Sequence, residues 1–230
     1  MMTQEFLNYL QDSYFTPLYL LTWVVAVSTY KRYYDTILKY FPVFIIYTFF
    51  TELLGYLVKH TNEFQFFSDS RYAWHNIIIY NIYSVASFTF FYYVYWKILK
   101  DENHKKKAKY AAITALFGYL ISLFFQNPFH KGLYWADLLA SIVLLYMITL
   151  YFIEKRKENN YYGMKHNLLF WVSLGLIIFH IFFPFIFIAA YDFPIFYYEY
   201  HLHEFLKVLI VIMYLLFIIG FLMGKRKAFR

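Results

Sequence analysis

The fold class is decided by residues 202–224, which read LHEFLKVLIVIMYLLFIIGFLMG. About 20 consecutive apolar residues in an α-helix rise roughly 30 Å, which is the thickness of the hydrocarbon core of a bilayer. A basic cluster begins immediately afterwards, at Lys225. An apolar run of this length that ends in basic residues predicts a transmembrane helix whose C-terminal end lies in the cytoplasm.

Six further apolar runs of transmembrane length precede this one. With residues 202–224 they make seven predicted spans, the others lying near residues 14–30, 38–58, 74–98, 110–126, 133–153 and 167–190. The polar stretches between the runs are too short to bury a core of their own. We therefore predict an all-α fold, a polytopic transmembrane bundle of about seven helices that forms a single domain over residues 1–230.

The composition also requires lipid as the solvent. Hydrophobic residues make up 62% of the chain and charged residues 15%, whereas a soluble domain carries roughly 45–50% and 25%. Attraction of basic loops to anionic lipid headgroups explains the net charge of +7, so nucleic acid is not an expected partner. The chain contains no cysteine, which excludes disulfides, thiolate metal sites and a cysteine nucleophile.

Basic residues gather in alternate connections between the predicted spans. Most of the 21 Lys and Arg residues lie at 31–39, 97–109, 155–165 and 225–230. Because cytoplasmic segments retain Lys and Arg, this pattern predicts a multi-pass protein of the cell membrane with its N-terminus outside and its C-terminus in the cytoplasm. Met1–Ser13 contain neither Lys nor Arg, so we expect the first span to be retained rather than removed as part of a signal peptide.

Six polar or ionisable side chains fall inside the predicted spans or in their first turns. An ionisable group within a bilayer is costly unless it faces protein or a water-filled cavity, so each is a candidate functional residue. Counting 1.5 Å per residue from the predicted outer ends places most of them roughly 6–12 Å deep, with His180 deeper. The predicted ligand-binding residues are Glu52, Asn81, Asp137, His180, His203 and Lys207.

Helical spacing gives several of these residues a polar neighbour on the same helix face. Glu52 shares a face with Thr48, and Asp137 shares one with Ser141. We predict that these faces converge on a pocket in the outer half of the bundle, open to the outside, with Lys207 paired to Glu52 or Asp137. The alternative is an internal network of ion pairs and hydrogen bonds that fixes helix packing and binds no ligand.

The same residues show no arrangement that indicates catalysis. His201 and His203 are two residues apart and cannot share a helix face as an i, i+4 metal-binding pair would. No nucleophile arrangement is recognisable, so we expect a non-enzymatic protein without catalytic residues, metal site or cofactor. A zinc site formed by His180, His203 and a carboxylate is the alternative.

Tyrosine and phenylalanine dominate an aromatic content of 27%. Many of these rings, together with Trp74 and Trp135, fall near the ends of predicted spans. Belts of aromatic residues at the two membrane–water interfaces explain this placement. An aromatic cage that binds a ligand is the alternative interpretation.

Small residues and prolines predict how the helices pack and bend. Gly118 lies four residues from both Thr114 and Ser122, and Gly220 lies near the end of the last span. Such small residues allow the backbones of membrane helices to approach closely. Pro42 and Pro184 lie within predicted spans, where we expect local kinks.

Two short segments resemble those of uncharacterised seven-helix membrane proteins of bacteria. They are Thr51-Glu52-Leu53-Leu54-Gly55-Tyr56 and Tyr80-Asn81-Ile82-Tyr83-Ser84. The resemblance covers the whole bundle by its pattern of spans, but only these two segments carry it. It implies a receptor-like protein of the bacterial inner membrane and assigns no chemistry.

These observations favour a receptor-like protein that binds a ligand from outside and acts through a cytoplasmic or membrane protein partner. The basic run Lys100–Lys109 is the candidate docking site, although attraction to anionic lipid also explains it. A transporter or channel is the second interpretation, with Glu52, Asp137 and His180 as the path of an ion or proton; it requires polar groups that continue through the inner half of the bundle. A metal-dependent enzyme embedded in the membrane is the third.

Overall fold

The computed structural model describes residues 15–158 and 163–226, and these residues form helices and no strand. Five helical segments are long and apolar enough to cross a membrane: Ile37–His60, Ile77–Ile98, Tyr134–Lys157, Leu168–Asp192 and Leu202–Met223. The predicted all-α class is confirmed, and the chain has the apolar helices of an integral membrane protein. The expectation for Met1–Ser13 lies outside the described residues. A count of seven spans and the orientation of the termini remain predictions.

Seven helices of 14 residues or more occupy the positions of the seven predicted spans within the described part of the chain. Their bounds are α2 (Phe15–Ser28), α3 (Phe41–His60), α4 (Ile77–Ile98), α5 (Glu102–Ser122), α6 (Tyr134–Lys157), α7 (Leu168–Asp192) and α9 (Leu202–Met223). A short helix, α8 (Pro194–Glu199), joins α7 to α9. Short 3-10 segments lie at Tyr30–Arg32, Ile37–Tyr40, Asn62–Phe64 and Met164–His166.

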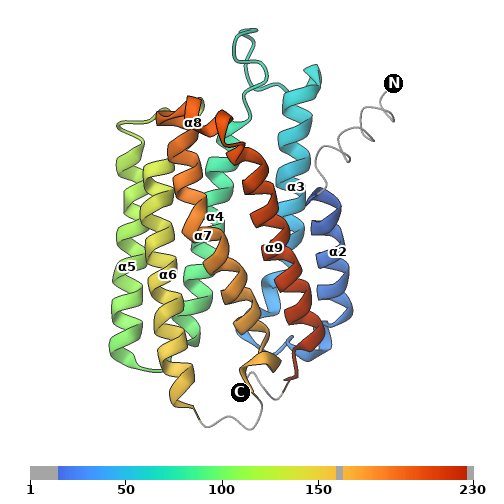
Figure 1. The fold of residues 1–230 in the computed structure, drawn as a ribbon, viewed down its shortest axis with the longest axis vertical. Helices are drawn as coiled ribbons and strands as arrows, with labels where there is room; N and C mark the ends of the chain where they lie inside the picture. The colour runs from blue at the N-terminus through green and yellow to red at the C-terminus, as the bar shows by residue number, and fades with distance from the viewer. Residues whose placement is uncertain (1–14, 159–162, 227–230) are drawn as a thin grey trace.

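The long helices run side by side along the long axis of the molecule (Figure 1). We call one end of the bundle the α8 end; it holds α8 and the connections at 61–76 and 123–133. We call the other the tail end; it holds the connections at 29–40 and 99–101 and the last residue of α9, Met223. The described residues of the basic connections identified in the sequence therefore lie together at the tail end.

Helix contacts close the bundle into a ring. The helix α2 packs against α3 and α9, α9 packs against α7, and α7 packs against α6. The ring is completed because α4 packs against both α6 and α3. The helix α5 packs on α4 and α6 from outside, so it covers the ring without forming part of its inner wall.

The start of α5 differs from the prediction. The helix begins at Glu102 rather than near residue 110, because the Asp101 carboxylate accepts hydrogen bonds from the backbone N–H groups of Asn103 and His104 at 2.8 and 3.0 Å. The N–H of His104 lowers the pKa of Asp101. The lysines from Lys105 onward therefore lie on regular helix rather than in a loop.

The second half of α5 exposes a stripe of large apolar side chains. The exposed residues are Tyr110, Ile113, Phe117, Leu120 and Ile121. A large apolar surface of this kind is costly in water, and a lipid environment removes that cost. The charged residues in the first turns of α5 lower its mean hydropathy, so α5 is not among the five helical segments apolar enough to cross a membrane.

The two prolines have different structural roles. Pro42 occupies the first turn of α3, where the missing N–H has no helical partner to lose, so the prediction that it kinks the second span is wrong. Pro184 lies inside α7, as predicted. The sequence placed Pro42 too deep because α3 is preceded by the separate 3-10 turn Ile37–Tyr40.

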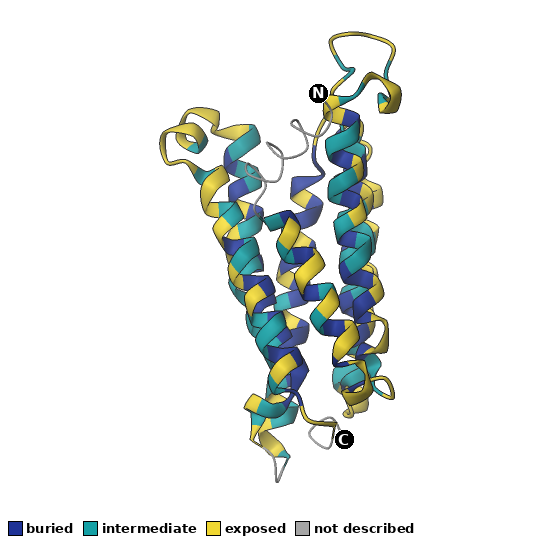
Figure 2. Ribbon diagram, turned by 90° about the vertical axis from the view of Figure 1, so that its right-hand side faces the viewer, coloured by how far each residue is buried: buried dark blue, intermediate teal, exposed yellow. Residues whose placement is uncertain are grey.

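Buried residues lie along the inner faces of the helices (Figure 2). Gly220 allows α9 to approach α7: a Cβ placed there would lie 2.9 Å from side-chain atoms of Leu168 and Trp171, which confirms its predicted packing role. Gly175 of α7 was not singled out in the sequence, yet it also lies against the backbone of the neighbouring helix. A Cβ at Gly175 would lie 3.1 Å from the backbone oxygen of Met213 on α9.

We predict that Gly175→Val destabilises the protein by about 1–3 kcal/mol, because the added side chain forces α7 and α9 apart. The measurement is thermal unfolding of purified protein in detergent. Gly163→Ala is the matched control, since a Cβ at Gly163 has no neighbour within 4 Å. Equal melting temperatures for the two variants would show that α7 and α9 do not approach as closely as described.

Candidate functional site

A cavity of about 360 Å³ occupies the inside of the ring. Its lining comes from α2, α3, α4, α6, α7, α8 and α9, with Gly132 from the connection before α6, and no described residue of α5 takes part. On α9 the lining extends from His203 to Phe217, which corresponds to about 21 Å at 1.5 Å per residue. The cavity therefore starts at the α8 end and passes the middle of the bundle, deeper than the outer half predicted from the sequence.

All six residues predicted from the sequence line this one cavity: Glu52, Asn81, Asp137, His180, His203 and Lys207. Their arrangement differs from the prediction in one respect. The Lys207 ammonium pairs with Glu204 at 3.0 Å, three residues earlier on α9, and not with Glu52 or Asp137. Neighbours one helical turn apart meet without any approach of two helices, so Glu204 is the nearer partner.

Glu52 lies on the cavity wall formed by α3. Its carboxylate accepts a hydrogen bond of 3.1 Å from the Tyr80 hydroxyl. Three further cavity-lining tyrosines are close enough to interact electrostatically with Glu52. With Tyr80 they form a set that we call the tyrosine cluster: Tyr19, Tyr80, Tyr83 and Tyr214.

Asp137 is held by groups that account for its charge. It is 3% exposed and lies in the first turn of α6, where the partial positive charge of a helix N-terminus stabilises an anion. The Tyr119 hydroxyl donates a hydrogen bond of 2.5 Å to the carboxylate. Ser84 on α4 lies close to it. The Tyr119 hydrogen bond thus joins α5 to α6.

Asn81 clamps the connection between α5 and α6. Its amide N–H groups donate to the backbone oxygens of Pro128 and Lys131 at 2.7 and 3.0 Å. Its carbonyl oxygen accepts from the backbone N–H of Leu133 at 3.0 Å. Both donor hydrogens of the amide are therefore used within the protein, which favours a structural role over the predicted contact with a ligand.

We predict that Asn81→Ala lowers stability by about 2–4 kcal/mol, because it leaves three backbone groups, one buried and two partly buried, without partners. Thermal unfolding in detergent measures the loss. The control is Asn103→Ala, which removes an exposed asparagine side chain and changes stability by less than about 0.5 kcal/mol. A melting temperature for Asn81→Ala equal to that of the control would exclude the clamp.

The two histidines occupy different environments. His180 is 7% exposed, and its Nδ1 lies 3.0 Å from the hydroxyl oxygen of Ser141. The ring of Phe88 packs beside it, with centroids 5.2 Å apart. His203 lies at the mouth of the cavity and contacts Glu204 at 3.3 Å. Among the described residues no three His, Asp or Glu side chains gather to hold a metal ion, so the alternative zinc site of His180, His203 and a carboxylate is not formed.

Phenylalanine and tyrosine make up about half of the residues that line the cavity, whereas the sequence analysis attributed such rings chiefly to interfacial belts. On α7 they recur at every fourth residue and face the cavity together. A periodicity of four on one helix was the signal that would have separated them from an interfacial belt. The α7 rings that line the cavity are Phe179, Phe183, Phe187 and Tyr191.

Packed phenylalanines close the cavity on the side of the tail end. Phe44 and Phe217 are its deepest residues on α3 and α9. Beyond them lies Phe41, which is fully buried and packs against Phe217 with ring centroids 5.2 Å apart. Phe91 packs against Phe44 at 5.0 Å.

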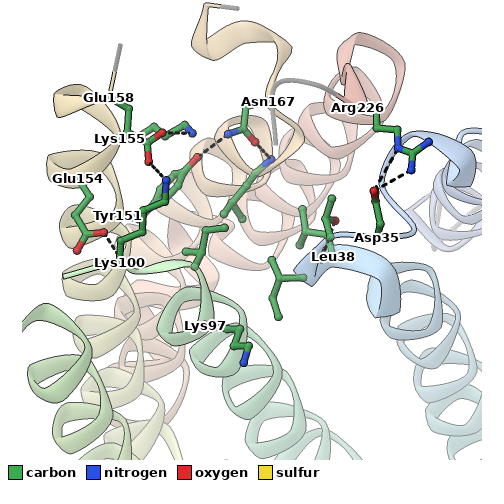
Figure 3. Close-up of a pocket in the computed structure, with 14 residues that line it drawn as sticks. Asp35, Leu38, Lys97, Lys100, Tyr151, Glu154, Lys155, Glu158, Asn167 and Arg226 are labelled. Carbon is green, nitrogen blue, oxygen red and sulfur yellow. Dashed lines mark hydrogen bonds and ion pairs between the residues drawn. The ribbon is translucent and has the colours of Figure 1, made fainter. Parts of the chain in front are cut away.

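A second cavity, of about 290 Å³, lies at the tail end (Figure 3). Glu158 at the end of α6 pairs with Lys100 at 2.7 Å and with Lys155 at 2.6 Å. Arg226 pairs with Asp35 at 3.0 Å, and this contact raises the pKa of Arg226. The charged groups therefore tie the connections of the tail end to one another. Internal pairing explains this cavity without a ligand.

Comparison with known protein families, with curated proteins and with solved structures gives no match to this chain. The cavity of the ring is therefore assigned from its own geometry and chemistry.

Proposed function

We propose that this protein is a membrane receptor-like protein that binds a small ligand with a largely apolar body in the cavity of the ring. The observation that carries the proposal is the cavity itself. Its volume of about 360 Å³ falls within the range of roughly 300–1,000 Å³ that is typical of small-molecule sites. Such sites combine apolar and aromatic walls with a few polar groups, and this lining has that composition.

The cavity is better suited to holding a ligand than to passing an ion. Its inner end is blocked by the rings of Phe41, Phe44 and Phe217. Below these rings the polar side chains pair with each other: Tyr95 with Ser173 at 2.8 Å, and Tyr151 with Asn167 at 3.2 Å. A conduction path requires polar groups that continue through the bundle, so this arrangement supports a binding protein over a transporter or channel.

Charge distribution supports an orientation with the cavity mouth on the outside. The basic connections lie at the tail end, and Lys and Arg accumulate in cytoplasmic connections. In this orientation a ligand enters from outside, and a cytoplasmic partner meets the basic first turns of α5. Lys106 and Lys107 are exposed there.

Labelling of single cysteines tests this orientation, because the natural chain has none. We predict that Lys131→Cys at the α8 end reacts with a membrane-impermeant maleimide on intact cells. Lys106→Cys should react only after the cells are permeabilised. Both positions are exposed in the structure, so access across the membrane decides the result. The opposite labelling pattern would reverse the orientation.

A cavity-filling substitution tests ligand binding. Thermal unfolding of the protein in nanodiscs would be followed against a library of neutral and charged one- and two-ring fragments. We predict that some fragments raise the melting temperature of the natural protein by several degrees, since a saturating ligand contributes about 2–4 kcal/mol. Ser87→Phe, which fills the cavity, should abolish these shifts.

The control variant is Ile82→Phe, which adds the same ring to α4 at a position that is 59% exposed. This variant should respond to the fragments as the natural protein does. If no fragment gives a shift that depends on Ser87, the cavity is not a ligand site and the proposed function is wrong. A fragment that moves across the membrane in reconstituted vesicles would instead favour a transporter.

A further inference from the structure

We propose that the ligand of this cavity is an organic cation, held by the Glu52 carboxylate and the faces of the tyrosine cluster. The inference rests on the proposed function and specifies the chemistry of its ligand. It follows from the charge of Glu52, from the rings around it and from the place of Lys207 at the mouth.

Glu52 differs from Asp137 in how its charge is balanced. Asp137 has a hydroxyl donor and lies at the N-terminus of its own helix. Glu52 lies past the middle of α3, away from the N-terminus of that helix. Its hydrogen bond comes from the Tyr80 hydroxyl, whereas a carboxylate has about four acceptor positions. Acceptor capacity of Glu52 therefore remains available on the cavity wall.

No Lys, Arg or His within residues 15–158 and 163–226 forms an ion pair with Glu52. The cation of the cavity, Lys207, is engaged by Glu204 at the mouth. A carboxylate at this depth is costly without a positive partner. A bound cation supplies that partner, and a protonated amine also donates hydrogen bonds to the free acceptor positions.

The tyrosine cluster lies near this carboxylate and comes from three helices. Tyr19 of α2 and Tyr214 of α9 pack together with ring centroids 4.5 Å apart. Tyr83 of α4 is held by Thr48, whose hydroxyl oxygen lies 3.2 Å from that of Tyr83. Tyrosine faces attract ammonium groups through their π-electrons, and several rings together bind quaternary ammonium ions. The combination of these rings with the Glu52 carboxylate favours a cation over a neutral ligand or an anion.

The remaining residues that line the cavity determine the chemistry of the uncharged part of the ligand. Phe179, Phe183 and Phe187 of α7 present an apolar wall. A ligand that fills the cavity therefore carries an apolar or aromatic body beside its charged group. Amines and quaternary ammonium ions with one aromatic ring have this chemistry, whereas inorganic cations lack the apolar body.

Binding of two matched probes to the protein in nanodiscs tests the inference. The probes are benzyltrimethylammonium and neopentylbenzene, which share one shape and differ in charge because carbon replaces nitrogen in the second. We expect the cation to bind at least about tenfold more tightly than its neutral isostere, as read from thermal shifts at increasing concentration. Ser87→Phe should abolish binding of both.

The charge of Glu52 is tested by Glu52→Gln, which should weaken binding of the cation about tenfold and leave the isostere unchanged. Glu199→Gln is the matched control, because it removes an exposed acid at the α8 end and should change neither affinity. Should Glu52→Gln fail to fold, Tyr83→Phe and Tyr83→Leu give an independent test. The phenylalanine variant keeps the aromatic ring and should keep the preference for the cation. The leucine variant loses the ring and should lose this preference.

Equal affinities for the two probes, both abolished by Ser87→Phe, would overturn the cation proposal and leave the cavity as a ligand site. A preference for the cation that persists in both Glu52→Gln and Tyr83→Leu would also overturn it. If neither probe binds and the fragment library gives no shift that depends on Ser87, the proposed function fails together with this inference.

Discussion

The structure depends on one constraint: polar groups placed in hydrocarbon must find their partners inside the protein. The helices satisfy their own backbone, and the side chains within the bundle satisfy the irregular segments. Asn81 shows this most clearly, since one amide holds three backbone groups of the connection between α5 and α6. Tyr92 meets the constraint differently, by donating to the backbone oxygen of Ala140 at 2.7 Å.

The same constraint separates structural polar groups from the candidate binding group. Asp137, His180 and Glu52 all line the cavity, and each has a hydroxyl partner on a neighbouring helix. Asp137 also lies in the first turn of its own helix, whereas Glu52 lies past the middle of α3 and is therefore balanced less completely. The polar layer therefore combines both interpretations of the sequence: most members form a packing network, and Glu52 is the member best placed to bind something else.

The ring of helices makes this division of roles physically possible. Because α5 lies outside the ring, six long helices surround the cavity and α5 stabilises them from one side. Large aromatic side chains fill the inner end of the cavity, while small polar side chains such as those of Ser84 and Ser87 leave space nearer the α8 end. The charged network at the tail end holds the connections of these helices together through Glu158 and Arg226. A ligand in the cavity thus contacts helices whose other ends are held together by this charged network.

The sequence by itself determined the all-α class, the positions of the long helices and the candidate residues that prove to line one cavity. These features depend on the length of apolar runs and on the rarity of polar residues within them, which are properties of the chain alone. Only the tertiary structure decided that Asn81 clamps a connection and that the aromatic rings of α7 face inward. Such contacts depend on how each helix is rotated and which helix lies beside it, and residues as distant as Tyr19 and Tyr214 meet only when the ring closes.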